Sequence, residues 1–382
     1  MDMKELALQK HAEWKGKLSV ETKAPITNKE ELAIAYTPGV AEPCLEIEKD
    51  ENLAYTYTGK SNTVAVITDG TAVLGLGDIG PSAAMPVMEG KCALFKAFAG
   101  IDAVPICIDS KDPQVIIDTV YNISKSFGGI NLEDISAPRC FEIERALIEK
   151  CDVPVFHDDQ HGTAITVCAA LINACKVTGR KLGDLKIVIN GAGAAGIAIA
   201  KMFLNFSFGS VLICDRKGVL YTGAAFNNAE QEKLAAITNP EGFRGSLADA
   251  MKGADVFVGV SRPGLVTQDM VRSMAKNPIV FAMSNPVPEI MPDLAKEAGA
   301  AVVGTGRSDF PNQVNNVIAF PGVFRGALDG RKRVITDEMK MVSAHAIASV
   351  IPDEELSADN VLPDPFDPRI VERIKAAILA CE

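Results

Sequence analysis

A glycine-rich segment in the middle of the chain constrains the fold more than any other stretch. The run 186-KIVINGAGAAGIAIAKMF-203 places Gly191, Gly193 and Gly196 directly after an apolar, β-branched run and at the start of a helix-like one. In such a segment the first glycine permits a tight turn, the second lets the backbone approach a pyrophosphate, and the third allows the helix to pack on the strand. The segment therefore predicts a strand, a turn and a helix whose N-terminus binds a dinucleotide phosphate.

The next strand-like run, 211-VLICD-215, supports this interpretation. It ends in Asp215, where a carboxylate can accept hydrogen bonds from an adenosine ribose. The small residues Ala192, Ala194 and Ala195 complete the predicted binding loop. Arg216 and Lys217 follow at once and could bind a 2′-phosphate or lie in a solvated loop, so NAD and NADP remain alternatives. A glycine-rich packing turn is the competing interpretation of the whole segment.

Short apolar runs alternate with longer helix-like stretches along the chain, which is typical of α/β proteins. Buried parallel strands are predicted at 64–68, 103–109 and 153–156 in the first half, and at 186–190, 211–215, 255–259, 279–283 and 301–304 in the second. Helices are predicted near 86–98, 112–126, 138–150 and 163–178, and a closing helix after the Pro-rich turn at 363–369. With 382 residues, we expect two domains: an N-terminal α/β domain over 1–160 and a C-terminal doubly wound, Rossmann-type domain over 161–382.

The charge and the cysteines of the chain exclude several classes of protein. A formal net charge of -11 would be repelled by a phosphate backbone, so nucleic acid is not an expected partner. Every apolar run is interrupted before it could cross a membrane, and the first residues lack a secretory signal pattern, which indicates a cytoplasmic protein. The nine cysteines include no C-x-x-C pair, so we expect reduced thiols rather than disulfides or a thiolate zinc site.

Acidic residues follow two of the apolar runs in the first half. Glu133 and Asp134 come after 130–132, and Asp158 and Asp159 come after 153–156. Ligands of open α/β sheets bind beyond the carboxyl ends of the strands, so these carboxylates could converge there and bind Mg²⁺ or Mn²⁺, which prefer oxygen ligands. Capping of the following helices is the alternative explanation.

Three further residue types in the first half could carry chemistry. Lys91 stands in an apolar stretch near a predicted helix start, where it could be a desolvated base or a lysine that reaches solvent. Tyr36 lies in a Pro/Gly-rich loop, where its phenol could donate a proton or the ring could simply pack. His157 and His161 would share one helix face as a metal pair, but we expect their segment not yet to be helical.

Taken together, these segments resemble the short bacterial members of the malic enzyme family over most of the chain. The matching segments are 36-YTPGVA-41, 68-TDGTAVLGLGDIG-80, 85-MPVMEGKCALFKAFAGIDAVPI-106, 133-EDI-135, 155-VFHDDQHGTA-164, 190-NGAGAAG-196, 284-SNP-286, 315-NN-316 and 320-FPG-322. The resemblance implies a homodimer that converts L-malate to pyruvate and carbon dioxide with NAD or NADP and a divalent cation.

The resemblance also implies a role for each matching residue. Glu133, Asp134 and Asp159 would bind the metal, Lys91 would be the base that takes the C2 hydroxyl proton, and Tyr36 the acid that protonates C3. Asp158 would partner Lys91, whose pKa we expect to be lowered by desolvation and the neighbouring cation. Asn285 would lie near both the substrate and the nicotinamide end of the cofactor, and Asn315 near the substrate.

One departure from the family pattern concerns the substrate carboxylate. Larger relatives carry an arginine where 69-DGTAVLGLGD-78 has Ala72, so Asn285, Asn315 and an unidentified cation are the candidates for holding that carboxylate. Two other functions remain alternatives. A malolactic-type enzyme would retain the dinucleotide and release lactate, and a dinucleotide-sensing protein would use the same fold without catalysis.

Overall fold

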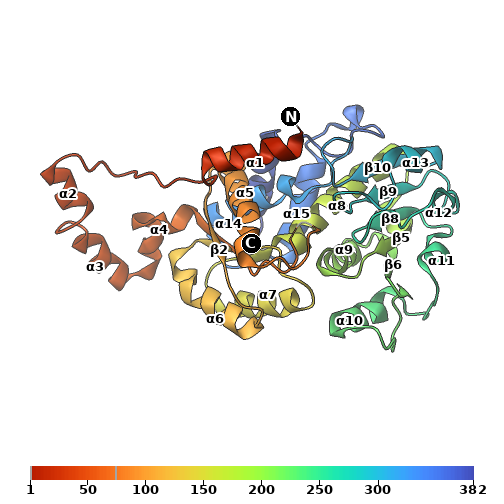
Figure 1. Ribbon diagram of the computed structural model, residues 1–382, viewed down its shortest axis with the longest axis horizontal. Helices are drawn as coiled ribbons and strands as arrows, with labels where there is room; N and C mark the ends of the chain where they lie inside the picture. The colour runs from red at the N-terminus through yellow and green to blue at the C-terminus, as the bar shows by residue number, and fades with distance from the viewer. Residues whose placement is uncertain (1, 74) are drawn as a thin grey trace.

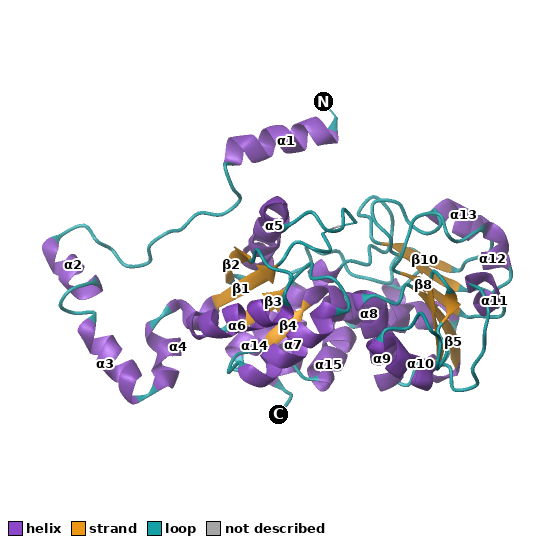
Figure 2. Ribbon diagram, turned by 60° about the horizontal axis from the view of Figure 1, so that its bottom comes forward, coloured by secondary structure: helices purple, strands orange, loops and turns teal. Residues whose placement is uncertain are grey.

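Two β-sheets, one parallel and one mostly parallel, form the framework of the protein, which a computed structural model describes for residues 2–73 and 75–382. Figure 2 shows their strands as two groups with α8 between them. The first sheet has the order β2-β1-β3-β4, and all of its strands are parallel. Its strands are β1 (Thr63–Thr68), β2 (Asp102–Cys107), β3 (Gly129–Leu132) and β4 (Val155–His157). β3 corresponds to the short apolar run that precedes Glu133.

The second sheet has the doubly wound order expected for a dinucleotide-binding domain. The order is β10-β9-β8-β5-β6-β7, and only β7 is antiparallel to its neighbour among the described strands. The strands are β5 (Leu185–Asn190), β6 (Gly209–Asp215), β7 (Gly218–Val219), β8 (Val256–Gly259), β9 (Ile279–Ala282) and β10 (Val302–Thr305). The winding reverses between β5 and β8, which is the place where open α/β sheets bind ligands. The predicted α/β class with a Rossmann-type second half is confirmed.

Helices lie around both sheets and along the N-terminal segment (Figure 1). They are α1 (Met3–Trp14), α2 (Lys29–Ala35), α3 (Ala41–Lys49), α4 (Ala54–Tyr57), α5 (Pro81–Ala99), α6 (Pro113–Ile123), α7 (Arg139–Lys150), α8 (Asp158–Thr178), α9 (Ala194–Asn205), α10 (Ala229–Thr238), α11 (Leu247–Met251), α12 (Gln268–Arg272), α13 (Pro292–Glu297), α14 (Phe320–Asp329), α15 (Asp337–Ala348) and α16 (Arg369–Leu379). Short 3₁₀ turns η1 to η6 lie at 51–53, 59–62, 124–126, 182–184, 316–318 and 353–355.

The C-terminal helices return to the first sheet. Phe320 and Phe324 of α14 pack edge-on against Phe95 of α5, with ring centroids 4.7 and 5.2 Å apart. Phe324 also meets Phe156 of β4 at 5.8 Å. These contacts bury α14 against the first half of the chain. Such packing supplies most of the stability of an amphipathic helix.

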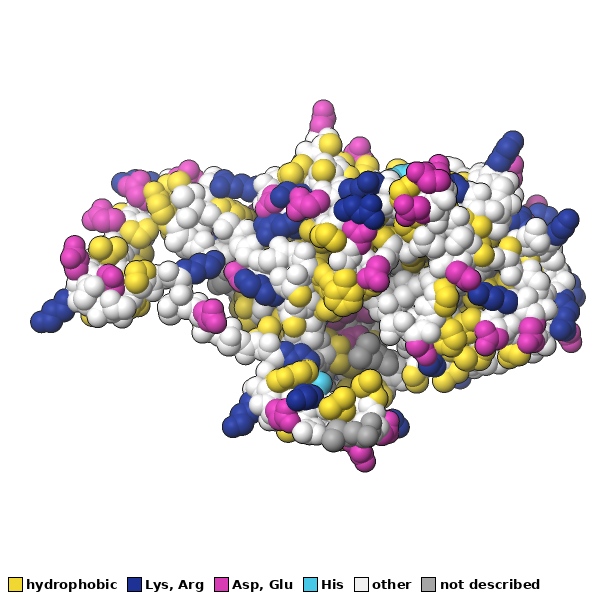
Figure 3. Space-filling view, turned by 90° about the horizontal axis from the view of Figure 1, so that it is seen from above, with side chains coloured by type: hydrophobic (Ala, Val, Ile, Leu, Met, Phe, Trp, Pro, Cys, Tyr) yellow, Lys and Arg dark blue, Asp and Glu magenta, His cyan; other side chains and the backbone are white. Residues whose placement is uncertain are grey.

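The N-terminal segment stands apart from this packed body. Figures 1 and 2 both show α2 and α3 at the end of an arm that projects away from the two sheets. Figure 3 shows hydrophobic side chains along this arm, with acidic and basic ones between them. No described helix is long and apolar enough to span a membrane. All nine cysteines are free thiols.

Candidate active site

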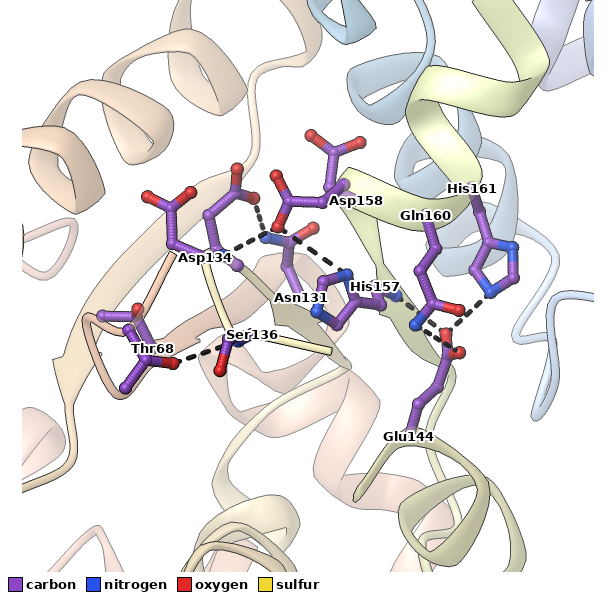
Figure 4. A network of polar contacts seen from close by, with 12 residues as sticks. Thr68, Asn131, Asp134, Ser136, Glu144, His157, Asp158, Gln160 and His161 are labelled. Atoms are coloured by element: carbon purple, nitrogen blue, oxygen red, sulfur yellow. Dashed lines mark hydrogen bonds and ion pairs between the residues drawn. The ribbon is translucent and has the colours of Figure 1, made fainter. Parts of the chain in front are cut away.

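The carboxyl ends of three adjacent parallel strands bring acidic side chains to one edge of the first sheet. Asp69 follows β1, Glu133 follows β3, and Asp158 follows β4. Leu132 of β3 pairs with His157 of β4, so the residues after them leave the sheet side by side. Figure 4 shows Asp134 and Asp158 on this edge. The sheet register therefore brings together carboxylates from distant parts of the chain.

Glu133, Asp134 and Asp159 form one cluster. Each residue offers a carboxylate oxygen, and these three oxygens lie within 4.8 Å of one another. The Asp134 backbone N–H donates to Asp159 Oδ2 at 2.8 Å, and Asp134 has φ 53°, a left-handed conformation that aspartate tolerates better than most residues. Hard oxygen donors at this spacing suit Mg²⁺ or Mn²⁺, so the residues fit the divalent metal expected from the sequence.

Lys91 lies in the middle of α5 rather than near its start, and its side chain is buried beside the cluster. Its Nζ lies 2.5 Å from Asp158 Oδ2 and 2.9 Å from Glu133 Oε1. The same Nζ lies 4.3 Å from the centre of the Phe320 ring. Lys91 is therefore a buried cation that contacts two carboxylates. This position rules out the alternative in which its side chain reaches solvent.

Desolvation together with a neighbouring cation is expected to lower the pKa of Lys91, but the side chains of this site by themselves raise it. Burial does lower the pKa of Lys91, but the Asp158 and Glu133 carboxylates outweigh burial and raise it above its ordinary value. Burial also raises the pKa of Glu133, and Asp159 adds to that rise although Lys91 opposes it. One ammonium thus faces more negative charge than it can balance, which is a second reason why the cluster suits a divalent cation.

The segment 157–162 corrects another expectation, because α8 already begins at Asp158. Asp158 and Asp159 occupy its first turn, where carboxylates are favoured by the helix dipole. A Cβ on Gly162, one turn later, would stand 1.8 Å from Asp158 Oδ1. Glycine at this position therefore leaves the space that the Asp158 carboxylate fills.

The two histidines of this segment do not form a metal pair. His161 Nε2 lies 2.9 Å from Glu144 Oε1 on α7, whereas His157 Nδ1 lies 3.7 Å from Asp159 Oδ2. Glu144 also accepts hydrogen bonds from the backbone N–H of His157 at 2.9 Å and from Gln160 Nε2 at 3.1 Å (Figure 4). Although burial opposes it, the pKa of Glu144 is lowered to about 2, chiefly by His161. This buried carboxylate fixes the junction of β4 and α8.

The glycine loop of the second sheet has the geometry of a phosphate-binding turn. Gly191 has φ 122°, and a Cβ there would stand 2.6 Å from the Val260 carbonyl oxygen after β8. A Cβ on Gly196 would stand 1.7 Å from the Gly191 carbonyl oxygen. Nothing lies within 4 Å of a Cβ on Gly193, the residue before α9. The first and third glycines are thus required by packing, and the second leaves room for a ligand.

Asp215 lies at the end of β6, beside the glycine loop. Gln231 of α10 donates from Nε2 to the Ala192 carbonyl at 3.0 Å, and the same Nε2 lies 3.5 Å from Asp215 Oδ2. Arg216 and Lys217, next in the chain, are exposed. The side-chain amide of Gln231 therefore holds the Asp215 carboxylate next to the glycine loop. A site for the ribose and pyrophosphate of a dinucleotide requires these two groups to be neighbours.

Asn285 and Asn315 come from loops of the second sheet. The Asn285 carbonyl oxygen would lie 2.8 Å from a Cβ on Gly75, so this loop meets the matching segment 68–80 of the first half. Leu74 of that segment lies outside the described residues. Asn315 accepts a hydrogen bond from Val317 N–H at 2.9 Å and caps η5, which begins at the next residue. Asn285 is exposed at this meeting of the two halves, whereas Asn315 uses its side-chain oxygen locally.

Arg139 is a cation that contacts the loop carrying Ala72. Its Nη2 lies 2.9 Å from Asp69 Oδ2 and donates to Thr71 Oγ1 at 2.9 Å, while Ala72 N–H donates to the Asp134 carbonyl at 2.9 Å. The charge of Arg139 is already paired with Asp69. Arg139 therefore stabilises the loop after β1.

Tyr36 is not near the other candidate residues in this chain. It directly follows α2, which lies on the projecting arm (Figure 1), and it is 66% exposed. The site described above thus contains every candidate catalytic and metal residue except this one.

Sequence reasoning also missed two buried supporting residues. Asn131 of β3 is fully buried and donates from Nδ2 to Glu133 Oε2 at 2.9 Å. Its signal was an asparagine within an otherwise apolar strand, where a polar side chain needs a partner. Glu144 sits on a helix whose pattern looks amphipathic, and its role became visible only through its contacts with β4 and α8.

Comparison with known proteins gives a consistent result over nearly the whole chain. Residues 15–148 match the family model described as malic enzyme, N-terminal domain, and residues 160–371 match malic enzyme, NAD binding domain. A bifunctional malic/malolactic enzyme of Bacillus subtilis is 54% identical over 99% of this chain and 92% of that protein. An NADP-dependent malic enzyme of Halomonas elongata is 50% identical over 98% of this chain and 92% of that protein.

A solved structure is similar as well. The crystal structure of an NAD-dependent malic enzyme from Thermotoga maritima superposes with a TM-score of 0.95 and 46% sequence identity. The superposition covers 98% of this chain and 99% of that one.

Proposed function

Because the chain belongs to the malic enzyme family, we propose that it oxidises and decarboxylates L-malate to pyruvate and carbon dioxide, with NAD or NADP as oxidant. The observation that carries the proposal is the buried Lys91, held between Asp158 and Glu133 beside three convergent carboxylates. A base, a hard-metal cluster and a phosphate-binding turn in one chain match the demands of this reaction.

Glu133, Asp134 and Asp159 would hold Mg²⁺ or Mn²⁺, which supplies Lewis-acid stabilisation of negative charge on a substrate oxygen. The loop from Gly191 to Gly196, with Ala192, Ala194 and Ala195, would hold the pyrophosphate of NAD or NADP, and Asp215 the ribose, so that the nicotinamide can accept a hydride.

Lys91 takes the proton of the malate C2 hydroxyl. To act as the base, Lys91 would first release its own proton to solvent. A cation held by Glu133, Asp134 and Asp159 would draw the Glu133 charge away from Lys91, which would leave Asp158 as the main anionic partner of the lysine. Asp158 then orients the amine, and the space left by Gly162 lets it do so. Tyr36 delivers a proton to C3 after carbon dioxide has left, and Asn285 and Asn315 contact the substrate where Ala72 replaces the arginine of larger relatives.

Supporting proposals concern organisation rather than chemistry. We propose that residues 1–160 form the catalytic and metal domain and 161–382 the dinucleotide domain, which agrees in outline with the ranges of the two family models. We also propose a homodimer in the cytoplasm, in line with the free thiols and the apolar arm.

The test is direct. Purified chain incubated with malate, Mn²⁺ and either dinucleotide should form reduced nicotinamide and pyruvate in equal amounts. Equal turnover after exhaustive chelation, or no malate-dependent reduction with either dinucleotide, would contradict the proposal. Because the Bacillus subtilis relative is named for both activities, lactate should be measured in the same reactions. Lactate formed with no net reduction of the dinucleotide would indicate the malolactic reaction.

A further inference from the structure

Asn285 lies where the loop after β1 meets the loop after β10. A Cβ on Gly75, in the loop that carries Ala72, would stand 2.8 Å from the Asn285 carbonyl oxygen. A Cβ on Gly306, directly after β10, would stand 2.8 Å from Asn285 Nδ2. Glycine at both positions permits this close approach. The segment that lacks the arginine of larger relatives is therefore joined to the loop after β10 through one asparagine.

The loop after β10 also reaches the surroundings of the proposed base. Val314 N–H donates to the Thr305 carbonyl at 2.7 Å, which closes the loop 306–313. Two residues later, the Asn316 Cβ lies 3.1 Å from the position of a Cβ on Gly162, the glycine of α8 that leaves space for the carboxylate beside the base. The loop 306–313 is thus flanked by both proposed substrate asparagines, one before it in space and one after it in sequence.

Arg307 supplies a guanidinium on this loop. Its Nη1 donates to the Pro286 carbonyl at 3.2 Å, one residue after Asn285. Its Nε and Nη2 donate to Asp309 Oδ1 and Oδ2 at 2.8 and 2.6 Å. Two parallel hydrogen bonds of this kind are the geometry in which arginine binds carboxylate ligands. The Asp309 side chain is 56% exposed, and ion pairs at such exposed positions contribute little, so another carboxylate can take its place.

Two other cations near the loop after β1 suit a ligand less well. Arg139 pairs with Asp69, whose side chain is fully buried, and loss of that pair would leave an uncompensated charge inside the protein. Lys111 pairs with Asp78 and follows β2, the edge strand farthest from β4. A lysine is also a point charge, without the planar fork that matches a carboxylate. Arg307 is therefore the better candidate.

We propose that Arg307 binds a carboxylate of malate in exchange for Asp309, and that it supplies the positive charge that this chain lacks at Ala72. The proposal rests on malate as the substrate. In the free protein, Asp309 stands in for the substrate carboxylate and keeps the guanidinium ordered, which lowers the cost of binding. The substrate then lies in the crevice at the carboxyl ends of the strands, next to Asn285.

The first experiment measures malate binding without turnover. L-Malate is titrated by calorimetry in the presence of Mn²⁺ and reduced dinucleotide, so that no oxidant is present. Arg307→Ala should weaken malate binding about 10–100-fold, because a charge-assisted, two-point contact is lost. Its affinity for the reduced dinucleotide should equal that of the wild type. Added guanidinium, but not ammonium, should restore malate binding, and Arg307→Lys should keep only part of it.

The matched control is Arg369→Ala, because Arg369 forms the same two-point pair with Asp367, the residue two positions before it. This control should bind malate as the wild type does. Unchanged malate affinity of Arg307→Ala would overturn the proposal. Rescue by ammonium as effective as rescue by guanidinium would overturn the two-point contact.

A second variant tests the exchange itself. Asp309→Asn should bind malate about two- to fivefold more tightly, because the substrate carboxylate no longer displaces an ionised partner from the guanidinium. A role of Arg307 limited to the Pro286 carbonyl predicts no such gain. Equal or weaker malate binding by Asp309→Asn would therefore overturn the exchange.

Steady-state kinetics distinguish failure of this proposal from failure of the proposed function. Arg307→Ala should raise the KM for malate much more than it lowers kcat, while Lys111→Ala should change neither. The opposite result for these two variants would assign the carboxylate to Lys111 and overturn the role of Arg307. If the wild-type chain neither bound nor oxidised malate, the proposed function itself would be wrong, and this proposal with it.

Discussion

Lys91 Nζ lies 2.5 Å from Asp158 Oδ2, although the two residues are 67 positions apart in the chain. The pair is buried, and Glu133 is the second carboxylate on the lysine at 2.9 Å. Because Glu133 is also one of the three clustered carboxylates, the proposed base and the proposed metal site share a residue. Protonation of Lys91 and occupancy of the cluster are therefore linked in this site.

Asp159→Ala should abolish metal-dependent turnover, because it removes one of three hard anionic ligands. Added Mn²⁺ should raise the melting temperature of the wild-type chain but not that of the variant, since only a bound cation stabilises the folded state. The control is Asp118→Ala, an exposed carboxylate on α6. If the variant kept the Mn²⁺ stabilisation, Asp159 would not be a ligand.

Gly162→Ala should reduce turnover at least about 100-fold, because the new Cβ would displace the Asp158 carboxylate that orients Lys91. Circular dichroism should show that the helices remain. Gly90→Ala on α5 is the matched control, since nothing lies within 4 Å of its Cβ and alanine is favoured in helices. Unchanged turnover of Gly162→Ala would show that the Asp158 position is not critical.

Gly193→Val should weaken dinucleotide binding, because it fills the open space in front of α9 without disturbing the packing around Gly191 and Gly196. Titration of either dinucleotide by fluorescence or calorimetry measures the effect. Gly183→Val, whose Cβ meets only the Ser207 carbonyl oxygen at 3.7 Å, should bind as the wild type does. Equal affinity of the two variants would place the cofactor elsewhere.

Lys91→Ala and Tyr36→Phe should impair different steps, because one group takes a proton from oxygen and the other delivers one to carbon. Loss of Lys91 should slow malate oxidation about 10²–10⁴-fold, with partial rescue by small amines. Tyr36→Phe should slow deuterium incorporation at C3 of pyruvate in heavy water more than it slows reduction of supplied oxaloacetate. Equal slowing of both reactions, or of neither, would return Tyr36 to a packing or binding role.

Glu230→Gln should destabilise the chain at neutral pH by about 1–2 kcal/mol, because Glu230 of α10 pairs with Arg145 of α7 in the first half and with Lys201 and Lys233 in the second. Although burial opposes it, these partners lower the pKa of Glu230 to about 2. Because the pKa of Glu230 is lower in the folded chain than the value near 4.5 in the unfolded chain, its ionised carboxylate stabilises the fold at pH values above about 4.5. This stabilisation is lost as pH falls toward 2.

The difference in unfolding free energy between wild type and Glu230→Gln should therefore shrink as pH falls below about 4.5. Urea titrations at several pH values measure it. A difference that stayed constant with pH would mean that the charge of Glu230 does not contribute.

The sequence by itself determined the features that depend on neighbours in the chain. Strand and helix periodicity predicted the α/β class, and the spacing of Gly191, Gly193 and Gly196 predicted the turn after β5, because backbone conformation is encoded locally. The positions of Glu133 and Asp159 after apolar runs also indicated the correct edge of the sheet, since parallel strands end at the same edge. The resemblance to a family supplied the rest of the candidate residues.

Only the tertiary structure decided how those residues act on one another. The pKa of Lys91 depends on carboxylates 42 and 67 positions away, which outweigh desolvation and raise it, and no local pattern shows that they lie beside the lysine. Asn131 and Glu144 gained their roles from contacts that no local pattern encodes, and Tyr36 matched a motif while lying outside the site of its own chain. Electrostatics and burial are sums over neighbours in space, and chain folding and assembly determine those neighbours.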